Sequence, residues 1–296
     1  NPQTGACSHS LLPACLAQTW QRAVGGPNAE NFYSVVPAGD GGYVAAGSTR
    51  SWGSGGMDGW VVKVDGCGAV VWARTFGGAK DEEFWSIAPT PDGGYIAGGS
   101  SSTWPGSFVV KLDAQGNPVW QRVYGGGGLD YARLTRPLAS GGYLSLVEQY
   151  TYSSKPDVMH KATVMKLSST GDVVWVHSYG GEAQGDTVNG FVEQPDGTLV
   201  LGGGEESDAF SVGDDDFWLL KLDANGKHLS SRLYGTGADE EPIDFIQTSD
   251  GGWLFAGKVT TDTLYHSNDA ALVKVAADGT LQWARRWGGF DDDRAQ

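Results

Sequence analysis

Two sets of side chains recur at fixed places in this sequence and could do chemistry. The first set is acidic. Carboxylate oxygens are the ligands that hard cations such as Ca²⁺ prefer, so these acids could hold Ca²⁺ if the fold gathers them. The alternative is that each acid caps its own turn by accepting backbone hydrogen bonds. No copy has the dense Asp-x-Asp-x-Asp-Gly spacing of a dedicated calcium loop, and no other cofactor is expected. The candidate metal ligands are Asp81, Asp130, Asp186, Asp239 and Asp292.

The second set is aromatic and falls in polar stretches that read as loops. A flat apolar ring on an exposed loop suits a sugar ring or a side chain of a partner protein. The alternative is that each ring folds back over its own sheet. The candidate ligand-binding residues are Trp52, Trp104, Tyr150, Tyr152, Phe210 and Tyr265.

No catalytic constellation is recognisable. The chain has no Gly-x-Ser-x-Gly elbow, paired-histidine metal motif or phosphate-binding loop. Its five histidines are scattered, and none is spaced to share a metal with another. We therefore assign no catalytic residue, and the sequence favours a binding protein without deciding whether the chain is an enzyme.

Both sets are carried by an internal repeat. A tryptophan recurs about every 50 residues, and a period of this size indicates one supersecondary unit per repeat. The recurring residues are Trp20, Trp72, Trp120, Trp175 and Trp283, with Ser230 in the equivalent place. The 46 glycines of the 296 residues fall largely at fixed positions of this repeat, where tight turns need positive φ.

Each repeat reads as four short strands. In the second copy we expect strands at 84–90, 95–99, 108–113 and 119–124, joined by turns at Asp92-Gly93-Gly94 and Gly116-Asn117. Four antiparallel strands joined by short turns form a meander, and a meander of this size repeated about an axis is a β-propeller blade. The fold class is therefore all-β, with five complete blades.

The two ends leave the blade count open. Residues 19–26 read as an orphan outer strand before the first blade, whereas the sequence after Trp283 supplies the outer strand of the fifth. One alternative is a ring of five blades with a surplus strand. The other is a six-bladed ring whose last blade is incomplete in this chain, because propellers often close by combining strands from both termini.

The strand order places the two candidate sets on one face. The loop that enters the first strand of a blade and the loop that leaves the second are separated by two antiparallel strands. Both loops therefore lie on the same face of the propeller, and the acidic and aromatic side chains should share it.

The charge limits the partners. A net charge of −15 argues against nucleic acid and anionic membrane surfaces, which are bound by clustered Lys and Arg. No apolar run approaches the length of about 18 residues needed for a membrane span. We expect a glycan or an extracellular protein as partner, with no nucleic acid and no membrane span.

The three cysteines suggest one short loop. Cys7 and Cys15 could form a disulfide within the N-terminal extension, residues 1–16, which would leave Cys67 as an unpaired thiol. Residues 17–296 are then expected to form one propeller domain.

The repeat also resembles a known family. The motifs Trp-x-Arg-x-Tyr/Phe-Gly-Gly, Asp-Gly-Gly-Tyr and Val-Val-Lys-Leu-Asp, seen together between Trp72 and Asp113, are similar to the repeats of bacterial secreted and cell-surface propellers. They resemble in particular the seven-bladed bacterial propeller repeats, and the resemblance covers residues 17–296. It implies an extracellular or cell-surface protein and carries no shared catalytic residues. The blade count here departs from seven.

Three functions remain in competition. The first is a secreted, non-catalytic binding or scaffold propeller with a glycan or protein ligand on the acidic, aromatic face. The second is a carbohydrate-active hydrolase or lyase in which carboxylates at the channel mouth act as general acid and base, which changing Asp130 and Asp186 to Asn would test. The third is a structural subunit of an extracellular assembly or oligomer, in which another chain completes the end blade by strand addition.

Overall fold

The computed structural model describes residues 19–125, 129–150, 161–180, 185–205, 215–236, 238–262 and 267–288. In these residues, 20 strands form five four-stranded antiparallel sheets, which we call blades 1 to 5. Strands adjacent in a sheet are also consecutive in the chain, so each blade is the expected meander. No helix among the described residues is long and apolar enough to cross a membrane.

The strand bounds follow the repeat. Blade 1 contains β1 (Glu30–Pro37), β2 (Tyr43–Thr49), β3 (Asp58–Val64) and β4 (Val70–Phe76); blade 2 contains β5 (Glu82–Pro89), β6 (Tyr95–Ser101), β7 (Gly106–Leu112) and β8 (Pro118–Tyr124). Blade 3 contains β9 (Leu129–Pro137), β10 (Tyr143–Tyr150), β11 (Ala162–Leu167) and β12 (Val173–Tyr179). Blade 4 contains β13 (Thr187–Glu193), β14 (Leu199–Glu205), β15 (Asp216–Leu222) and β16 (His228–Tyr234); blade 5 contains β17 (Glu240–Gln247), β18 (Trp253–Asp262), β19 (Ser267–Val275) and β20 (Leu281–Trp287).

Turn chemistry fixes the hairpins. In blade 2, Gly93 has φ +81°, a conformation that favours glycine. Asp92 accepts the amide of Gly94 at 3.2 Å, and Lys111 of the third strand reaches the same carboxylate at 2.8 Å. Blades 1 and 5 repeat this ion pair with Lys63–Asp40 at 2.6 Å and Lys274–Asp250 at 3.0 Å. In these three blades the lysine therefore ties the third strand to the hairpin between the first two.

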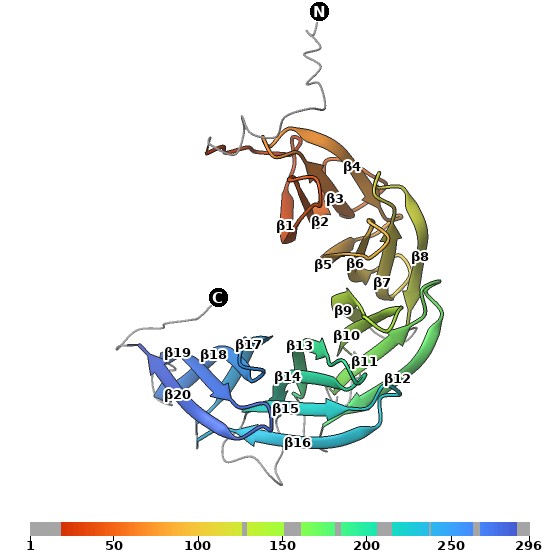
Figure 1. Cartoon of the computed structure of the whole chain (residues 1–296). Helices are drawn as coiled ribbons and strands as arrows, with labels where there is room; N and C mark the ends of the chain where they lie inside the picture. Colours follow the sequence, from red (N-terminus) through yellow and green to blue (C-terminus); the bar gives the residue numbers. More distant parts are fainter. Residues whose placement is uncertain are drawn as a thin grey trace, which may run out of the picture.

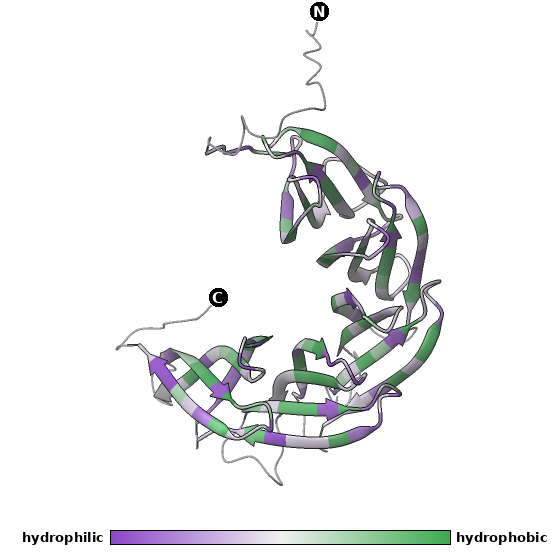
Figure 2. Ribbon diagram, in the orientation of Figure 1, coloured by the Kyte–Doolittle hydropathy of each residue, from purple (hydrophilic) through white to green (hydrophobic). Residues whose placement is uncertain are grey.

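The blades follow an arc about a central axis (Figure 1). The first strand of each blade lies innermost, and the fourth strand (β4, β8, β12, β16 or β20) lies outermost. Apolar residues concentrate on the middle strands of each blade, where neighbouring sheets face one another (Figure 2). The arc leaves one side open between blade 1 and blade 5, so the structure does not show a closed ring of five.

Side chains of the outer strands form hydrogen bonds with the following blade. Trp120 and Trp175 donate their indole N–H to turn carbonyls of the following blade, Ser169 at 3.1 Å and Ala224 at 3.3 Å. Tyr124 does the same with the carbonyl of Gly171 at 2.6 Å, and burial raises the pKa of its hydroxyl. The recurrent tryptophan is therefore a packing residue between sheets, as its repetition predicts, and in Trp120 and Trp175 it also donates a hydrogen bond to the next blade.

The N-terminal segment differs from the expected orphan strand. Residues 19–26 carry no strand assignment, and among the described residues no strand pairs with them. Trp20 nevertheless donates to the carbonyl of Gly66 at 3.0 Å and packs edge-on against Tyr43 at 6.4 Å. These contacts repeat those of Trp120 with blade 3, where it packs against Tyr143 at 5.8 Å.

Candidate functional site

The two sets of loops meet on one face, as expected. Around blades 1 and 2, the loop after β2 contacts the loop that enters β5: the amide of Met57 donates to Asp81 Oδ1 at 2.8 Å, and Glu82 donates its amide to the carbonyl of Met57 at 2.7 Å. The loop after β6 joins them, since Lys80 donates its amide to Thr103 Oγ1 at 2.9 Å. We call residues 50–57, 79–83 and 102–105 the loop face.

Two of the predicted ligand-binding residues are exposed on the loop face. Trp52 is 45% exposed and Trp104 is 49% exposed. One side of Trp52 rests on Trp60, with ring centroids 5.3 Å apart, which holds the ring in place. Trp104 is anchored by its backbone amide, which donates to Ser101 Oγ at 3.0 Å. The side chains of Tyr150, Tyr152, Phe210 and Tyr265 lie outside the described residues.

Charged groups also belong to the loop face that carries these two tryptophans. Arg50 approaches Asp81 at 4.0 Å, and both side chains are about half exposed. Glu83 is the third charged residue of the loop face. Burial raises the pKa of its carboxyl group, and the neighbouring charge of Asp81 adds to this shift. The loop face thus combines exposed indole rings with a guanidinium and two carboxyl groups.

The predicted metal ligands are not brought together. Asp130 is buried on β9, and Asp186 is buried just before β13. Asp81 is exposed on the loop face, and Asp239 is half-buried before β17. Asp292 lies outside the described residues. Across the described ranges, no group of three or more His, Cys, Asp or Glu side chains could hold a metal ion.

Several acids that recur at the start of the first strand of a blade instead cap backbone turns. Glu82 accepts the amide of Gly78 at 2.7 Å, and Glu240 accepts the amide of Thr236 at 3.3 Å. Each carboxylate therefore closes the connection that leads into its own blade, which is the alternative considered for this set.

Acids from the third strands form a feature that sequence reasoning missed. Asp58 faces Glu82 across the interface of blades 1 and 2, and burial, with the charge of Glu82 adding to it, raises the pKa of Asp58. Burial likewise raises the pKa of Glu240, and Asp216 across the interface of blades 4 and 5 adds to the shift. The signal was an acid five residues before the recurring lysine of the third strand, as Asp58 precedes Lys63 and Asp216 precedes Lys221.

The cysteine prediction needs correction. Cys67, in the turn between β3 and β4, is disulfide-bonded rather than a free thiol. The chain has only two other cysteines, Cys7 and Cys15, and both lie outside the described residues. The predicted pairing of Cys7 with Cys15 therefore stays a prediction.

Each innermost strand also contains a β-bulge, which sequence reasoning missed. In blades 1 and 2 the register skips Tyr33 and Trp85, so the side chains of β1 and β5 do not alternate regularly between the two faces of the sheet. The skipped residue lies along the inner edge of the sheets, where the tilted rings of Tyr33 and Trp85 pack with their centroids 4.5 Å apart. Blades 3, 4 and 5 place Arg133, Asn189 and Ile243 at the same register break.

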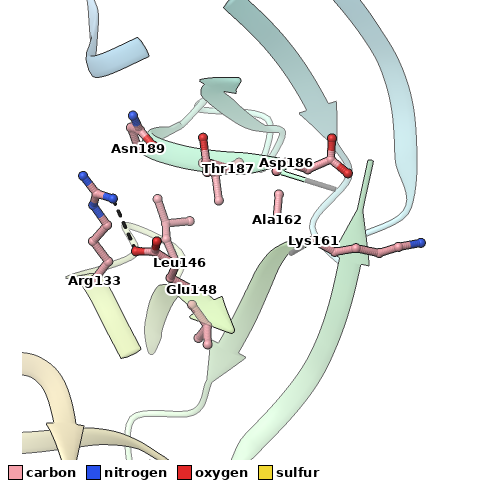
Figure 3. Close-up of a pocket in the computed structure, with 11 residues that line it drawn as sticks. Arg133, Leu146, Glu148, Lys161, Ala162, Asp186, Thr187 and Asn189 are labelled. Carbon is pink, nitrogen blue, oxygen red and sulfur yellow. Dashed lines mark hydrogen bonds and ion pairs between the residues drawn. The ribbon is translucent and has the colours of Figure 1, made fainter. Parts of the chain in front are cut away.

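Two of these bulge residues line a cavity of about 200 Å³ between blades 3 and 4 (Figure 3). Arg133 and Asn189 lie toward one end of the cavity, and Lys161 and Asp186 lie toward the other. Arg133 pairs with Glu148 at 3.3 Å. The Oδ1 atom of Asn189 is buried and accepts no hydrogen bond from the described residues.

Comparison with known proteins supports the fold and nothing finer. No family model matches the sequence, and no curated protein matches it. Three solved structures of similar shape are a protein of unknown function from Bacteroides caccae (12% identity, TM-score 0.53, 87% of this chain and 82% of that one), hydrazine synthase from Kuenenia stuttgartiensis (14%, 0.56, 92% and 71%) and cobalt-substituted ACO from Synechocystis (12%, 0.55, 90% and 64%). At these identities the likeness shows the fold alone, and this chain has an all-β, propeller-like architecture of four-stranded antiparallel sheets.

Proposed function

We propose that this chain is a non-catalytic binding propeller and that its loop face binds a carbohydrate. The observation that carries the proposal is the pair of tryptophans, Trp52 and Trp104, which stay about half exposed at equivalent loops of adjacent blades. An exposed indole offers a flat apolar surface to the C–H face of a sugar ring. Arg50 of the same loop as Trp52, and Asp81 of the loop that enters β5, supply donors and acceptors for sugar hydroxyl groups.

The site is held in shape before any ligand arrives. Trp52 rests on the buried Trp60, and Asp81 is fixed by the amide of Met57 at 2.8 Å. A preorganised surface loses less conformational entropy on binding. Such preorganisation is expected of a site for a sugar, which offers only a small apolar surface for binding.

The disulfide at Cys67 supports a location outside the cell. Disulfides persist in oxidising compartments and are rare in reducing ones. The net charge of −15 is compatible with a solvated surface that avoids anionic membranes and nucleic acids. We therefore propose an extracellular or cell-surface protein.

The test is a glycan array followed by calorimetry with the best oligosaccharide. We expect Trp52→Ala and Trp104→Ala each to weaken binding by about tenfold, the equivalent of about 1.4 kcal/mol, and within the range expected for an aromatic contact. Trp287→Ala is the matched control, because Trp287 is 51% exposed but lies at the end of β20, away from the loop face. Silence on the array, or equal loss in all three variants, would refute the proposal.

A further inference from the structure

The open face of blade 1 carries the same residues that blade 2 buries. Phe32 and Phe84 sit opposite Gly47 and Gly99 at equivalent positions of the two blades. Phe32 is 42% exposed, whereas Phe84 is fully buried against blade 1. The difference arises because blade 2 has a preceding blade and blade 1 has none among the described residues.

Two more pairs repeat this contrast. Val35 is 63% exposed and its equivalent Ile87 is 4% exposed; Tyr43 is 43% exposed and Tyr95 is 4% exposed. The exposed members line a groove of about 450 Å³ together with Trp20 and Val24. Blade 1 therefore presents the receiving half of an interface that the same molecule uses between blades 1 and 2.

The outermost position beside this groove is already filled. Trp20 holds the place on the turn of blade 1 that the outer-strand tryptophans of blades 2 and 3 hold on the blades that follow them. A complete blade from a second copy of this chain would bring its own outer strand to that place. Blade 5 of such a copy carries Trp283 there, so it would collide with residues 19–24.

We propose that the open face of blade 1 is the docking site of a three-stranded antiparallel segment with this same repeat pattern, and that residues 19–24 become its fourth strand. Its third strand runs antiparallel to residues 19–24 and places its lysine opposite Trp20, as Lys63 lies opposite Trp72. Its apolar residues cover Phe32, Val35 and Tyr43. The proposal is independent of the carbohydrate site.

The far face of blade 5, at the other end of the arc, also exposes apolar side chains. Ile246 is 50% exposed and Trp287 is 51% exposed. Their equivalents in blade 1, Val36 and Phe76, pack against the core that blades 1 and 2 share. Both ends of the arc are thus interior faces of a repeat array, and each is suited to a further repeat.

The test supplies the segment covalently. Residues 1–17 are replaced by a second copy of residues 79–117, the first three strands of blade 2, so that the copy runs directly into Gln18 and Trp20. A second variant uses residues 27–69 of blade 1 instead. The reference chain carries a scrambled sequence of residues 79–117.

Hydrogen exchange of the backbone amides in residues 19–24 is the readout. We expect exchange to slow by at least about 100-fold in both fusions, because these amides gain a paired strand. Adding Val35→Glu should abolish the slowing in the fusions, while the same change in the reference chain should have little effect because Val35 is largely exposed.

Two results would overturn the proposal. One is unchanged exchange of residues 19–24 in both fusions, whether or not the added segment folds. The other is a stable dimer of the unaltered chain by light scattering in which Phe32 and Tyr43 become protected, since a second copy would then be the occupant.

Discussion

Phe84 and Phe32 form a natural pair for measuring what one neighbouring blade contributes. Phe84 is fully buried and packs between Phe76 at 5.8 Å and Phe108 at 5.5 Å. Deleting such a ring removes its transfer free energy and leaves a cavity, which costs about 3–5 kcal/mol for Phe→Ala. We expect Phe84→Ala to lower the free energy of unfolding by this amount.

Phe32→Ala is the matched control at the same repeat position. Phe32 stacks on Trp60 at 4.9 Å but remains 42% exposed. Burying a large apolar side chain completely contributes roughly 1.5–3 kcal/mol, and removing Phe32 loses only part of this burial free energy. Solvent fills much of the space left behind. We expect a loss of about 1–2 kcal/mol.

Urea titrations followed by tryptophan fluorescence and circular dichroism give the comparison. Coincident transitions from the two probes are required, because arrays of repeats can unfold in steps. The expected difference between the two variants is about 2 kcal/mol. Equal losses would refute the reasoning, since they would mean that the face of blade 1 is covered in solution.

Three further predictions concern the recurring polar and glycine positions. Burial and the charge of Glu82 raise the pKa of Asp58. The ionised carboxylate therefore destabilises the folded protein above the folded-state pKa and has no such effect below the unfolded-state pKa of about 3.9. Asp58→Asn should raise the melting temperature at pH 7, and this gain should vanish near pH 4. Asp92→Ala should cost about 1–3 kcal/mol at pH 7, because it leaves the buried Lys111 ammonium short of an acceptor, whereas Asp196→Ala should cost little, since Lys221 of that blade donates to the carbonyl of Ala277. Lys111 and Thr90 lower the pKa of Asp92 to about 2, so in pH titrations of stability the difference between wild type and Asp92→Ala should be full above about pH 4 and disappear as the pH falls through 2. Gly99→Ala should destabilise by roughly 2 kcal/mol or more in urea, because its methyl group would overlap the carbonyl oxygen of Glu83, and Gly39→Ala, which meets no atom within 4 Å, should change stability by less than about 0.5 kcal/mol.

The sequence predicts the blades well because each is a local structure. The spacing from Trp72 to Trp120, the Asp92-Gly93-Gly94 hairpin and the third strand all lie within about 50 residues. The five sheets and their strand order are confirmed. The sequence leaves the blade count open between five and six, because closure depends on the angle between neighbouring sheets, which no single repeat encodes.

The acidic positions show where pattern reasoning fails. A carboxylate after Gly-Gly can cap a backbone amide or bind a cation, and the residue types are the same for both roles. Glu82 accepts the amide of Gly78, a contact that depends on the local fold and not on the residue types alone. The bulges could have been found, since Phe84 and Ile87 are three residues apart yet both pack toward blade 1, whereas plain alternation would place them on opposite sides. Gly99 opposite the bulge was a second sign, because glycine within a strand often marks one.

The bulge in each innermost strand leaves one residue per repeat outside the pleat. Tyr33, Trp85, Arg133, Asn189 and Ile243 differ in size, polarity and charge, yet the ladders on either side of them are alike. Such a position can change identity without disturbing the neighbouring strands. The inner wall of this protein is therefore free to diversify blade by blade during evolution, while the surfaces that hold the array together are constrained to repeat.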